Sequence, residues 1–256
     1  MGDANGGSGT YVYGVAPAGS PLALAGRGLA DQPVYAVETA RLRAIASAAP
    51  AGLVEATREN LGAHLRVVRE AREAGTVVPF RFGLVMPDDE AVRAELLTAN
   101  ADALEAVLAE LDGRWEMTVR ALYDEDALLR EAVDGRRDVA RLREEVRRLP
   151  EDAGYFARIR LGEAVAAAIG ALRERDAGLV VDRLAPLAVD VRTARDQPER
   201  VAVKASFLVD EDRLGEFDAA LEALATELAP RIRFKAVGPL PAHSFADVSL
   251  TAGSVA

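Results

Sequence analysis

The second half of the chain alternates between strand-like and helix-like patterns in one particular order. Strand-like segments, with alternating apolar and polar side chains or flanking turn residues, cover residues 115–122, 186–193, 201–209 and 231–238. Helix-like segments, with apolar residues spaced by three and four, cover residues 152–175 and 210–228. The order is strand, helix, strand, strand, helix, strand, which predicts a split βαβ, or ferredoxin-like, domain.

A highly charged stretch of mixed sign separates the first of these strands from the first helix. It covers residues 124–149, and its acids are interleaved with the arginines Arg136, Arg137, Arg141, Arg143, Arg147 and Arg148. Mixed charges at helical spacing are typical of a solvated helix with ion pairs between residues four apart. We therefore expect a helical insertion in the ferredoxin-like domain. A helix that binds a partner is the alternative interpretation.

The first half of the chain predicts a smaller α+β unit. Strand-like patterns cover residues 11–17, 32–38, 41–47 and 76–85, and the second and third of these form an expected hairpin. A helix is expected over residues 53–73, with an apolar stripe made of Val54, Leu61, Leu65 and Val68. A second helix begins at Asp88, whose carboxylate suits the positive end of a helix, and ends at Gly113.

These patterns together predict an α+β fold with two domains. The expected divisions are a flexible Gly/Ser-rich tail over residues 1–9, an N-terminal α+β domain over 10–112, a C-terminal ferredoxin-like domain over 113–248 with the insertion 124–149, and a tail over 249–256. No internal repeat is evident.

Composition restricts the class of function. Hydrophobic residues make up 50% of the 256 residues, enough for a core, but no apolar run approaches the roughly 20 residues of a membrane span. The N-terminus lacks the basic region of a signal peptide. The chain has no cysteine, which excludes disulfides, thiolate metal ligands and cysteine nucleophiles. A net charge of -10 argues against general binding to nucleic-acid phosphates. We expect a cytoplasmic protein.

The chain offers little material for a catalytic site. His64 lies near the apolar stripe of the first helix, where packing or hydrogen bonding is its expected role. His243 has no histidine or cysteine at metal-ligand spacing. The acidic clusters 88–90, 124–126 and 210–212 stand where helices are expected to begin, so capping explains them. The sequence predicts no catalytic residue, no metal, no cofactor and no enzymatic activity.

The expected strands of the ferredoxin-like sheet carry cations on one face. Because side chains alternate across a sheet, the face opposite the helices would present basic residues with few acids. These residues are Arg120, Lys204, Arg231, Arg233 and Lys235. One interpretation is a face that is solvated or covered by the other domain, and another is a docking face for an acidic partner. Nucleic-acid binding would require aromatic platforms, but the aromatic residues are expected to point into the core.

Several short segments, taken in their order along the chain, resemble one known family. They are Tyr11-Val12-Tyr13-Gly14-Val15, His64 with Val67, Val78-Pro79-Phe80-Arg81-Phe82-Gly83, Leu111-Asp112-Gly113-Arg114-Trp115-Glu116, Ser206-Phe207-Leu208-Val209-Asp210 with Glu216-Phe217, and Gly238-Pro239-Leu240-Pro241-Ala242-His243-Ser244-Phe245. This ordered set, between residues 10 and 248, resembles the gas vesicle accessory proteins of the GvpF/GvpL family. The last segment departs from the family, which tends to have aromatic and further proline residues at Leu240, Ala242 and His243.

The resemblance implies a non-enzymatic accessory protein of gas vesicles, the gas-filled organelles with a protein wall. Family members are minor components that bind the small hydrophobic shell subunit and help the shell to start or grow. The expected partners are that subunit and other accessory proteins, and the expected location is the cytoplasm, in association with the vesicle. The second hypothesis is a ferredoxin-like regulatory or nucleic-acid-binding module that uses the basic sheet face.

Two further segments are candidate contacts for such a partner. Pro79 cannot donate to a sheet ladder, so residues 76–85 are expected at a sheet edge or on a bulge, where a partner strand could add. On the same strand, Arg81 is expected either to form an interdomain ion pair or to contact the partner. In the C-terminal loop, His243 and Phe245 are the candidates. The sequence leaves the oligomeric state open.

Overall fold

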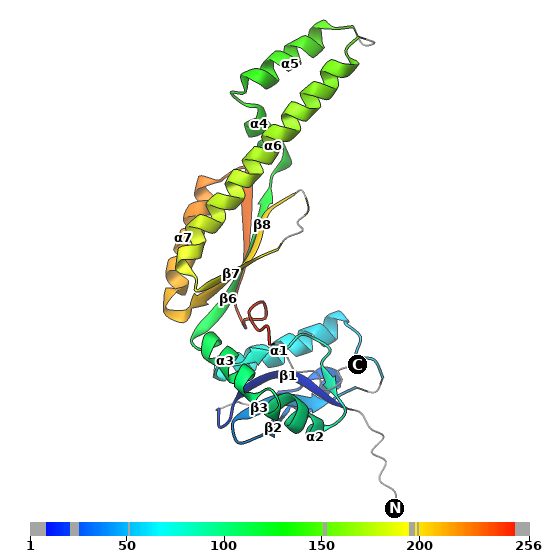
Figure 1. The fold of residues 1–256 in the computed structure, drawn as a ribbon, viewed down its shortest axis with the longest axis vertical. Coiled ribbons are helices and arrows are strands. Elements are labelled where there is room, and N and C mark those ends of the chain that lie inside the picture. The colour runs from blue at the N-terminus through cyan, green and yellow to red at the C-terminus, as the bar shows by residue number, and fades with distance from the viewer. Residues whose placement is uncertain are drawn as a thin grey trace, which may run out of the picture. The chain divides into compact units, whose positions relative to one another are not determined.

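The computed structural model describes residues 9–20, 26–50, 52–150, 153–194, 198 and 200–248, and it divides the chain into two compact units (Figure 1). The first unit comprises residues 1–116 together with 239–256, and the second comprises residues 117–238. In the described residues, each unit contains a β-sheet with helices packed against it. The predicted α+β class with two parts is therefore confirmed.

The sheet of the first unit is built around its N-terminal strand. β1 (Thr10–Pro17) pairs with β3 (Leu42–Ala48), which pairs in turn with β2 (Tyr35–Glu38). On its other edge β1 pairs with two short strands, β4 (Val78–Pro79) and β5 (Val85–Met86). These pairings are antiparallel, and the predicted hairpin of β2 and β3 is confirmed.

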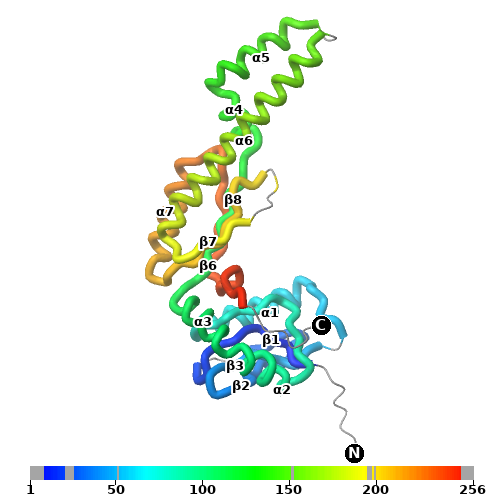
Figure 2. The backbone as a smooth tube through the Cα atoms, in the orientation of Figure 1, coloured from blue at the N-terminus to red at the C-terminus, as the bar shows by residue number. Residues whose placement is uncertain are grey.

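β1 is buried on both of its faces. Tyr11 and Tyr13 pack on one side against α1 (Arg58–Ala74). Val12, whose side chain alternates to the other side, is also fully buried. The helices against the other side are α2 (Asp89–Ala91), a π-helical segment (Val92–Thr98) and α3 (Ala101–Leu111), so β1 and β3 lie between α1 and this second group (Figure 2).

The first helix presents a different face to the core than predicted. α1 begins at Arg58 rather than residue 53, because the Thr57 side chain accepts the N–H of Asn60 and caps the helix there. Leu61 and Leu65 of the predicted stripe are exposed. The buried face consists of Ala63, His64, Val67, Val68, Ala71 and Arg72. Of the predicted stripe, Val68 is buried and Val54 packs against the core, but the two leucines are not part of the buried face.

The predicted helix from Asp88 to Gly113 is broken into parts. Asp88 does cap its start, since its carboxylate accepts the N–H of Ala91 at 2.8 Å. A π-helical segment follows, and Asn100 then interrupts the helix while its side-chain amide donates to the carbonyls of Glu95 and Leu96. These bonds satisfy carbonyls that the interruption would otherwise leave unpaired.

The second unit has the sheet order expected of a ferredoxin-like domain. Its strands are β6 (Arg114–Tyr123), β7 (Asp190–Thr193), β8 (Val201–Asp210) and β9 (Ile232–Leu240), in the order β7-β8-β6-β9. The two long helices that connect them are α6 (Tyr155–Leu184) and α7 (Leu214–Glu227). The predicted order of strands and helices is confirmed.

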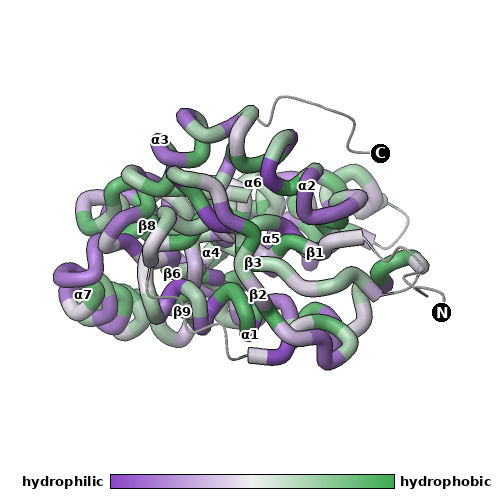
Figure 3. The backbone as a smooth tube through the Cα atoms, turned by 90° about the horizontal axis from the view of Figure 1, so that it is seen from below, coloured by the Kyte–Doolittle hydropathy of each residue, from purple (hydrophilic) through white to green (hydrophobic). Residues whose placement is uncertain are grey.

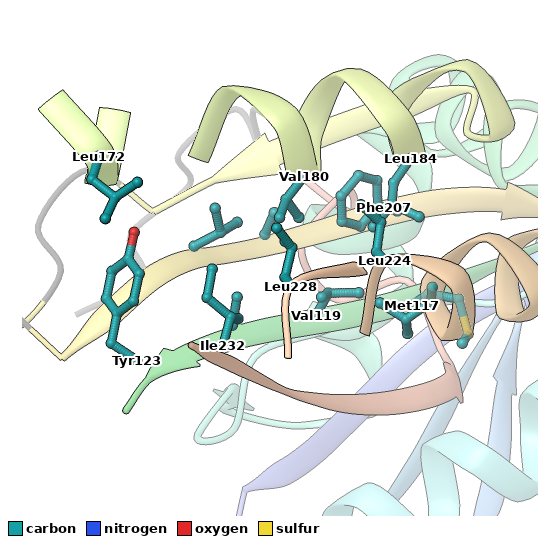
Figure 4. Packing of buried hydrophobic residues seen from close by; sticks show 14 of the residues in the cluster. Met117, Val119, Tyr123, Leu172, Val180, Leu184, Phe207, Leu224, Leu228 and Ile232 are labelled. Carbon is teal, nitrogen blue, oxygen red and sulfur yellow. The ribbon is translucent and has the colours of Figure 1, made fainter. Parts of the chain in front are cut away.

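The core of the second unit lies between this sheet and the two helices. Val180 and Leu184 of α6 and Leu224 of α7 point towards Val119 of β6 and Phe207 of β8 (Figure 4). The Phe207 ring lies 5.2 Å from that of Phe217, centroid to centroid. Hydrophobic and hydrophilic residues alternate along α7 (Figure 3), and Phe217, Leu221 and Leu224 are its buried residues. Burial of these apolar side chains is the main stabilising term of the unit.

The charged insertion is helical, as predicted, but it is two helices rather than one. α4 (Glu125–Val133) is capped by Asp124, whose carboxylate accepts the N–H of Ala127. Gly135, with φ of +67°, turns the chain into α5 (Arg137–Arg148), because glycine adopts positive φ without strain. α5 packs along the first half of α6, and α6 itself runs nine residues beyond the predicted end at 175.

Arg231 does not lie on the basic sheet face, and that part of the prediction is wrong. Its side chain is buried, and its guanidinium donates from Nε and Nη2 to the two oxygens of Asp176, each at 3.0 Å. A further bond joins it to Glu131 of α4, and the Tyr123 hydroxyl also donates to Asp176, at 3.2 Å. Arg231 therefore links β9 to α4 and α6 as a structural residue.

The domain division differs from the prediction at two places. Residues 113–116 group with the first unit, since the Arg72 guanidinium lies 4.0 Å above the centre of the Trp115 ring and donates to the carbonyl of Arg114. The C-terminal segment from 239 also belongs to the first unit instead of the ferredoxin-like domain, because Ser244 hydrogen-bonds to Glu116. The predicted tails, residues 1–9 and 249–256, lie outside the described residues except for Gly9.

Replacing Arg231 with alanine is expected to destabilise the second unit strongly. The change removes the buried cation that contacts both oxygens of Asp176 and leaves only the largely exposed Arg175, at 3.3 Å from one of them. Breaking one partner of a buried pair costs about 3–5 kcal/mol. Urea denaturation followed by circular dichroism would measure the loss in free energy of unfolding.

The matched control for this variant is Arg183→Ala, also on the second unit. The Arg183–Glu227 pair is about half exposed, so its loss should cost less than about 1 kcal/mol. Equal losses for the two variants would contradict the structural role of Arg231.

Candidate functional site

The two segments that carry the family resemblance most clearly lie side by side in the first unit. One is the β4–β5 segment, and the other is the C-terminal loop, whose described part ends at Val248. Together they line a groove of about 540 Å³, here called the motif groove. Its lining residues are Pro79, Phe80, Arg81, Phe82, Leu84, His243, Ala246, Asp247 and Val248.

The strand predicted over residues 76–85 is interrupted, and this interruption forms one wall of the groove. β4 and β5 are two residues each, and the chain turns away from β1 between them. The ends of the turn are held by β1, since Phe80 N–H donates to the Tyr13 carbonyl at 2.9 Å and Val12 N–H donates to the Leu84 carbonyl at 3.0 Å. Gly83 has a φ of +102°, which favours glycine at this point.

Pro79 lies on an edge strand, as predicted. β4 is the last strand of the order β2-β3-β1-β4, so the missing N–H of Pro79 removes no ladder bond on the free side. β4 also approaches β1 closely. A side chain at Gly14 would place its Cβ 2.7 Å from the Val78 carbonyl oxygen, so glycine is required there.

His64 holds the turn from inside the core, as expected of a packing and hydrogen-bonding histidine. The Phe80 carbonyl accepts from Nε2 at 3.1 Å, so Nε2 carries the ring proton. Nδ1 of the neutral ring then accepts from the Tyr11 hydroxyl at 2.9 Å, and this hydroxyl in turn accepts the N–H of Gly83 at 3.0 Å. Burial raises the pKa of Tyr11 to about 12 and lowers that of His64 to about 4, so both groups are neutral at pH 7.

The C-terminal loop is anchored by a buried carboxylate. Glu116 accepts hydrogen bonds from the backbone N–H and the hydroxyl of Ser244, at 2.8 and 2.7 Å, and its side chain is buried. Ala242 and Phe245 are buried as well. Phe245, which the sequence made a candidate contact for a partner, therefore packs inside the first unit and anchors the loop.

His243 is the loop residue that lines the groove with a polar group. Its ring lies 6.3 Å from that of His64, centroid to centroid, and burial lowers its pKa. Its Nε2 is buried and makes no hydrogen bond to any described residue. A buried polar atom without a partner costs free energy unless a ligand or water supplies the bond. The groove thus contains one unsatisfied hydrogen-bonding group.

Arg81 lies at the rim of the groove. Its side chain is 92% exposed, and its guanidinium is 3.8 Å from the carboxylate of Asp247, which is also largely exposed. Such a pair contributes little to stability in water. Arg81 is therefore available to contact another molecule. The sequence predicted an interdomain ion pair as one alternative for Arg81, whereas the pair that it makes with Asp247 lies within the first unit.

The other predicted contact residues lie together on the second unit. They are Arg120, Lys204, Arg233 and Lys235, here called the basic face, and all four are exposed. Asp124 N–H donates to the carbonyl of Arg231 at 2.8 Å, and an antiparallel register continued from that bond puts Arg120 opposite Lys235. The aromatic rings of this sheet point into the core, as expected.

The described residues hold no group of three or more histidine, aspartate or glutamate side chains arranged to bind a metal ion. Nor does any helix among them combine the length and the apolar character that crossing a membrane requires.

The stability of the first unit is expected to fall between pH 7 and pH 5 because of His64. Its pKa is about 4 in the fold and about 6.5 when unfolded, so the unfolded chain binds the proton more readily in this range. Stability is therefore retained above about pH 6.5 and lost as the pH falls, by about 2 kcal/mol at pH 5. Denaturation at both pH values would measure this loss.

The control for this prediction is His64→Gln, which cannot be protonated in this range. Its stability at pH 7 is expected to be lower than that of the natural chain, but its change between pH 7 and pH 5 should be smaller by about 2 kcal/mol. An unchanged pH dependence in the variant would rule out His64 as the titrating group.

Comparison with known proteins gives matches over nearly the whole chain. Gas vesicle protein F of Streptomyces sp. (strain CB03234) is 36% identical over 241 residues, which cover 93% of this chain and 99% of that protein. The crystal structure of the gas vesicle protein GvpF from Anabaena sp. PCC7120 is similar with a TM-score of 0.83 and 26% identity, over 94% of this chain and 99% of that one.

The fold is shared more widely than the sequence. The crystal structure of GvpF from Microcystis aeruginosa is similar with a TM-score of 0.77 at 24% identity, over 94% of this chain and 100% of that one. The sequence model of the family described as gas vesicle synthesis protein GvpL/GvpF matches residues 9–247. The chain therefore belongs to the GvpL/GvpF family of gas vesicle proteins.

Proposed function

We propose that this chain is a non-enzymatic accessory protein of gas vesicles that binds the small hydrophobic shell subunit through the motif groove and assists vesicle assembly. It acts in the cytoplasm, in association with the vesicle and with other accessory proteins. The observation that carries the proposal is the convergence of two segments, distant in sequence and both characteristic of the family, on one groove with an unsatisfied polar group.

The chemistry of the groove fits an extended apolar segment. Phe82 and Leu84 give it apolar, partly exposed walls, and His243 offers one hydrogen-bonding group for a backbone amide or carbonyl. An apolar groove with few polar groups, which fix orientation, is typical of peptide and ligand recognition. At the rim, Arg81 can exchange its weak contact with Asp247 for polar groups that flank the bound segment.

Because the edge strand β4 is short, the groove is a better binding site for the shell subunit than the edge of the sheet alone. β4 has two residues, one of them Pro79, so it offers few backbone groups to an added strand. Recognition by side-chain pockets beside a short edge gives specificity that backbone pairing lacks. The basic face is the alternative contact, because it would attract an acidic partner surface.

The test is co-expression with the major shell subunit and the other accessory proteins, followed by pull-down on this chain at physiological salt. Ala246→Trp fills the groove, and Ala219→Trp, at an exposed position of α7, is the matched control. Recovery of the shell subunit is expected to fall about tenfold or more in the groove variant and to stay unchanged in the control. Circular dichroism would verify that both variants fold.

A third variant addresses the alternative surface. It reverses the basic face with Arg120→Glu, Lys204→Glu, Arg233→Glu and Lys235→Glu, which are all exposed positions. Loss of binding here, with retention in Ala246→Trp, would move the contact to the basic face. Failure of the natural chain to recover any shell subunit would contradict the proposed function, and steeply salt-dependent binding to RNA or DNA would then favour the nucleic-acid module.

A further inference from the structure

The sheet of the second unit ends on one side in a long exposed strand. β9 is the last strand of the order β7-β8-β6-β9, so among the described residues it has β6 on one side and no strand on the other. Arg233 and residues 235–239 are exposed, and the Val237 side chain is 56% exposed. A strand edge of this length is a template for pairing with another chain.

The register of β9 determines which of its backbone groups face the free side. The N–H of Asp124, directly after β6, donates to the carbonyl of Arg231, so Arg231 and every second residue after it direct their backbone groups towards β6. The N–H and carbonyl groups of Phe234, Ala236 and Gly238 therefore point away from β6. These three residues, here called the free edge, can form the backbone hydrogen bonds of an added strand.

The side chains beside the free edge are positively charged on the face of the sheet that the helices leave open. Arg233 and Lys235 lie on that face, and the same register puts Arg120 of β6 opposite Lys235. None of these three cations forms an ion pair with a described residue. Like charges directly opposite each other on neighbouring strands are destabilising, so an anion beside them would relieve their repulsion.

This row of cations continues onto a third strand. The hydroxyls of Thr118 in β6 and Ser206 in β8 lie 3.3 Å apart, and two residues further along each strand Arg120 faces Lys204. Lys204, Arg120 and Lys235 thus form a row across β8, β6 and β9. The parts of these strands without any acid are residues 117–122, 201–209 and 231–240.

Acids occur only at the borders of this row. Residues 124–126 follow β6 and begin α4, and Asp210 lies at the far end of β8. Asp190, on the opposite edge strand β7, is paired with Arg192 at 3.2 Å. Residues 195–200, which connect β7 to β8, contain two acids and two arginines. The centre of the open face and the side of β9 that continues it therefore remain positive.

The two faces of the sheet define the sequence pattern of a strand that would add here. Its side chains would alternate between the faces. On the open face they would lie beside Arg233 and Lys235, which suits carboxylates. On the other face they would lie beside Ala236 and Phe234, which packs against the core of the second unit, and this suits apolar side chains. Acidic and apolar residues would thus alternate in the partner.

A second copy of β9 lacks this pattern. Two-fold antiparallel pairing would bring Arg233 and Lys235 of both copies onto neighbouring strands of the same face, and neither β9 contains an acid to separate them. Like charges brought together in this way oppose association. Charge complementarity therefore favours an acidic strand over self-pairing.

We infer that the free edge of β9 binds an extended segment of another protein, in which acidic and apolar residues alternate, by strand addition. Phe234, Ala236 and Gly238 supply the backbone hydrogen bonds, and the carboxylates of the segment pair with Arg233 and Lys235. The motif groove belongs to the first unit, so this site can be tested without the shell subunit.

Three synthetic peptides of about ten residues test this inference on the full-length chain. The first alternates glutamate with valine, the second alternates lysine with valine, and the third has the residues of the first arranged in two blocks. Fluorescence anisotropy at physiological salt would measure their affinities. The alternating glutamate peptide is expected to bind at least about tenfold more tightly than either of the others, because it alone has both the charge and the period.

A proline variant tests whether the backbone of the free edge makes the contact. Ala236→Pro removes an N–H that points away from β6, so the ladder with β6 keeps its bonds. This variant is expected to weaken binding of the alternating glutamate peptide by about tenfold or more. The matched control is Ala236→Val, which keeps the N–H and should bind the peptide as the natural chain does.

A charge-reversal variant tests the side chains. Arg233→Glu with Lys235→Glu is expected to exchange the preference, so that the alternating lysine peptide binds more tightly than the alternating glutamate peptide. The matched control is Arg58→Glu with Arg69→Glu, at exposed positions of α1, and it should keep the preference of the natural chain. Circular dichroism would verify that every variant folds.

Four results would overturn the inference. The first is no binding of the alternating glutamate peptide, and the second is equal affinity for the three peptides. The third is unchanged affinity in Ala236→Pro together with an unchanged preference in the charge-reversal variant. The fourth is a dimer of the natural chain in sedimentation that Ala236→Pro converts to monomer, because a second copy would then occupy the edge.

Discussion

β1 is bonded along both edges and buried on both faces, and the rest of the first unit depends on this position. The hydroxyl groups of its tyrosines form hydrogen bonds outside the strand. The Tyr11 hydroxyl bonds to the His64 ring and accepts the N–H of Gly83. The Tyr13 hydroxyl bonds to the Ser47 hydroxyl at 2.9 Å and accepts the N–H of Leu29. A single strand thus fixes the hairpin, the first helix and the turn of the motif groove. One wall of the groove is attached to the β1 backbone at both ends.

The second unit uses a buried ion pair where the first uses neutral hydrogen bonds. Arg231, just before β9, is bonded to Asp176 in the last third of α6 and to Glu131 in the inserted α4, so this cluster ties the insertion to the sheet. Buried pairs of this kind often add little net stability, yet the loss of one partner is strongly destabilising. The exposed rings of Tyr155 and Phe156, at the outer end of the hairpin, take no part in the core.

Local patterns in the sequence predicted much of the fold, and tertiary contacts explain the failures. The ferredoxin-like order could be read because each strand and helix is long and periodic, as in β8 and α7. Residues 76–85 resemble a strand by composition, but Pro79 and Gly83 break it where distant tyrosine groups supply the hydrogen bonds. Alternation put Arg231 on the basic face, but Arg231 precedes β9 and turns to Asp176, which lies 55 residues away in the sequence.

The candidate site was only partly predictable for the same reason. The sequence singled out the Val78–Gly83 and C-terminal segments separately, and Arg81 and His243 do line one groove. No pattern showed that Glu116 would anchor the loop through Ser244, or that Phe245 would turn inward. The sequence did indicate that Tyr11 and Tyr13 share one face, since they are two residues apart on a strand. It did not indicate the hydrogen-bond partners of their hydroxyl groups, because these partners lie far away along the chain.

The most direct test of the groove as the contact for the shell subunit uses the absence of cysteine from the chain. A single introduced cysteine then carries a photo-cross-linker at one known position. Arg81→Cys and Asp247→Cys report from the rim of the motif groove, and Lys204→Cys and Lys235→Cys report from the basic face. We predict cross-links to the co-expressed shell subunit from the two rim positions and none from the basic face. Cross-links from the basic face alone would contradict the account.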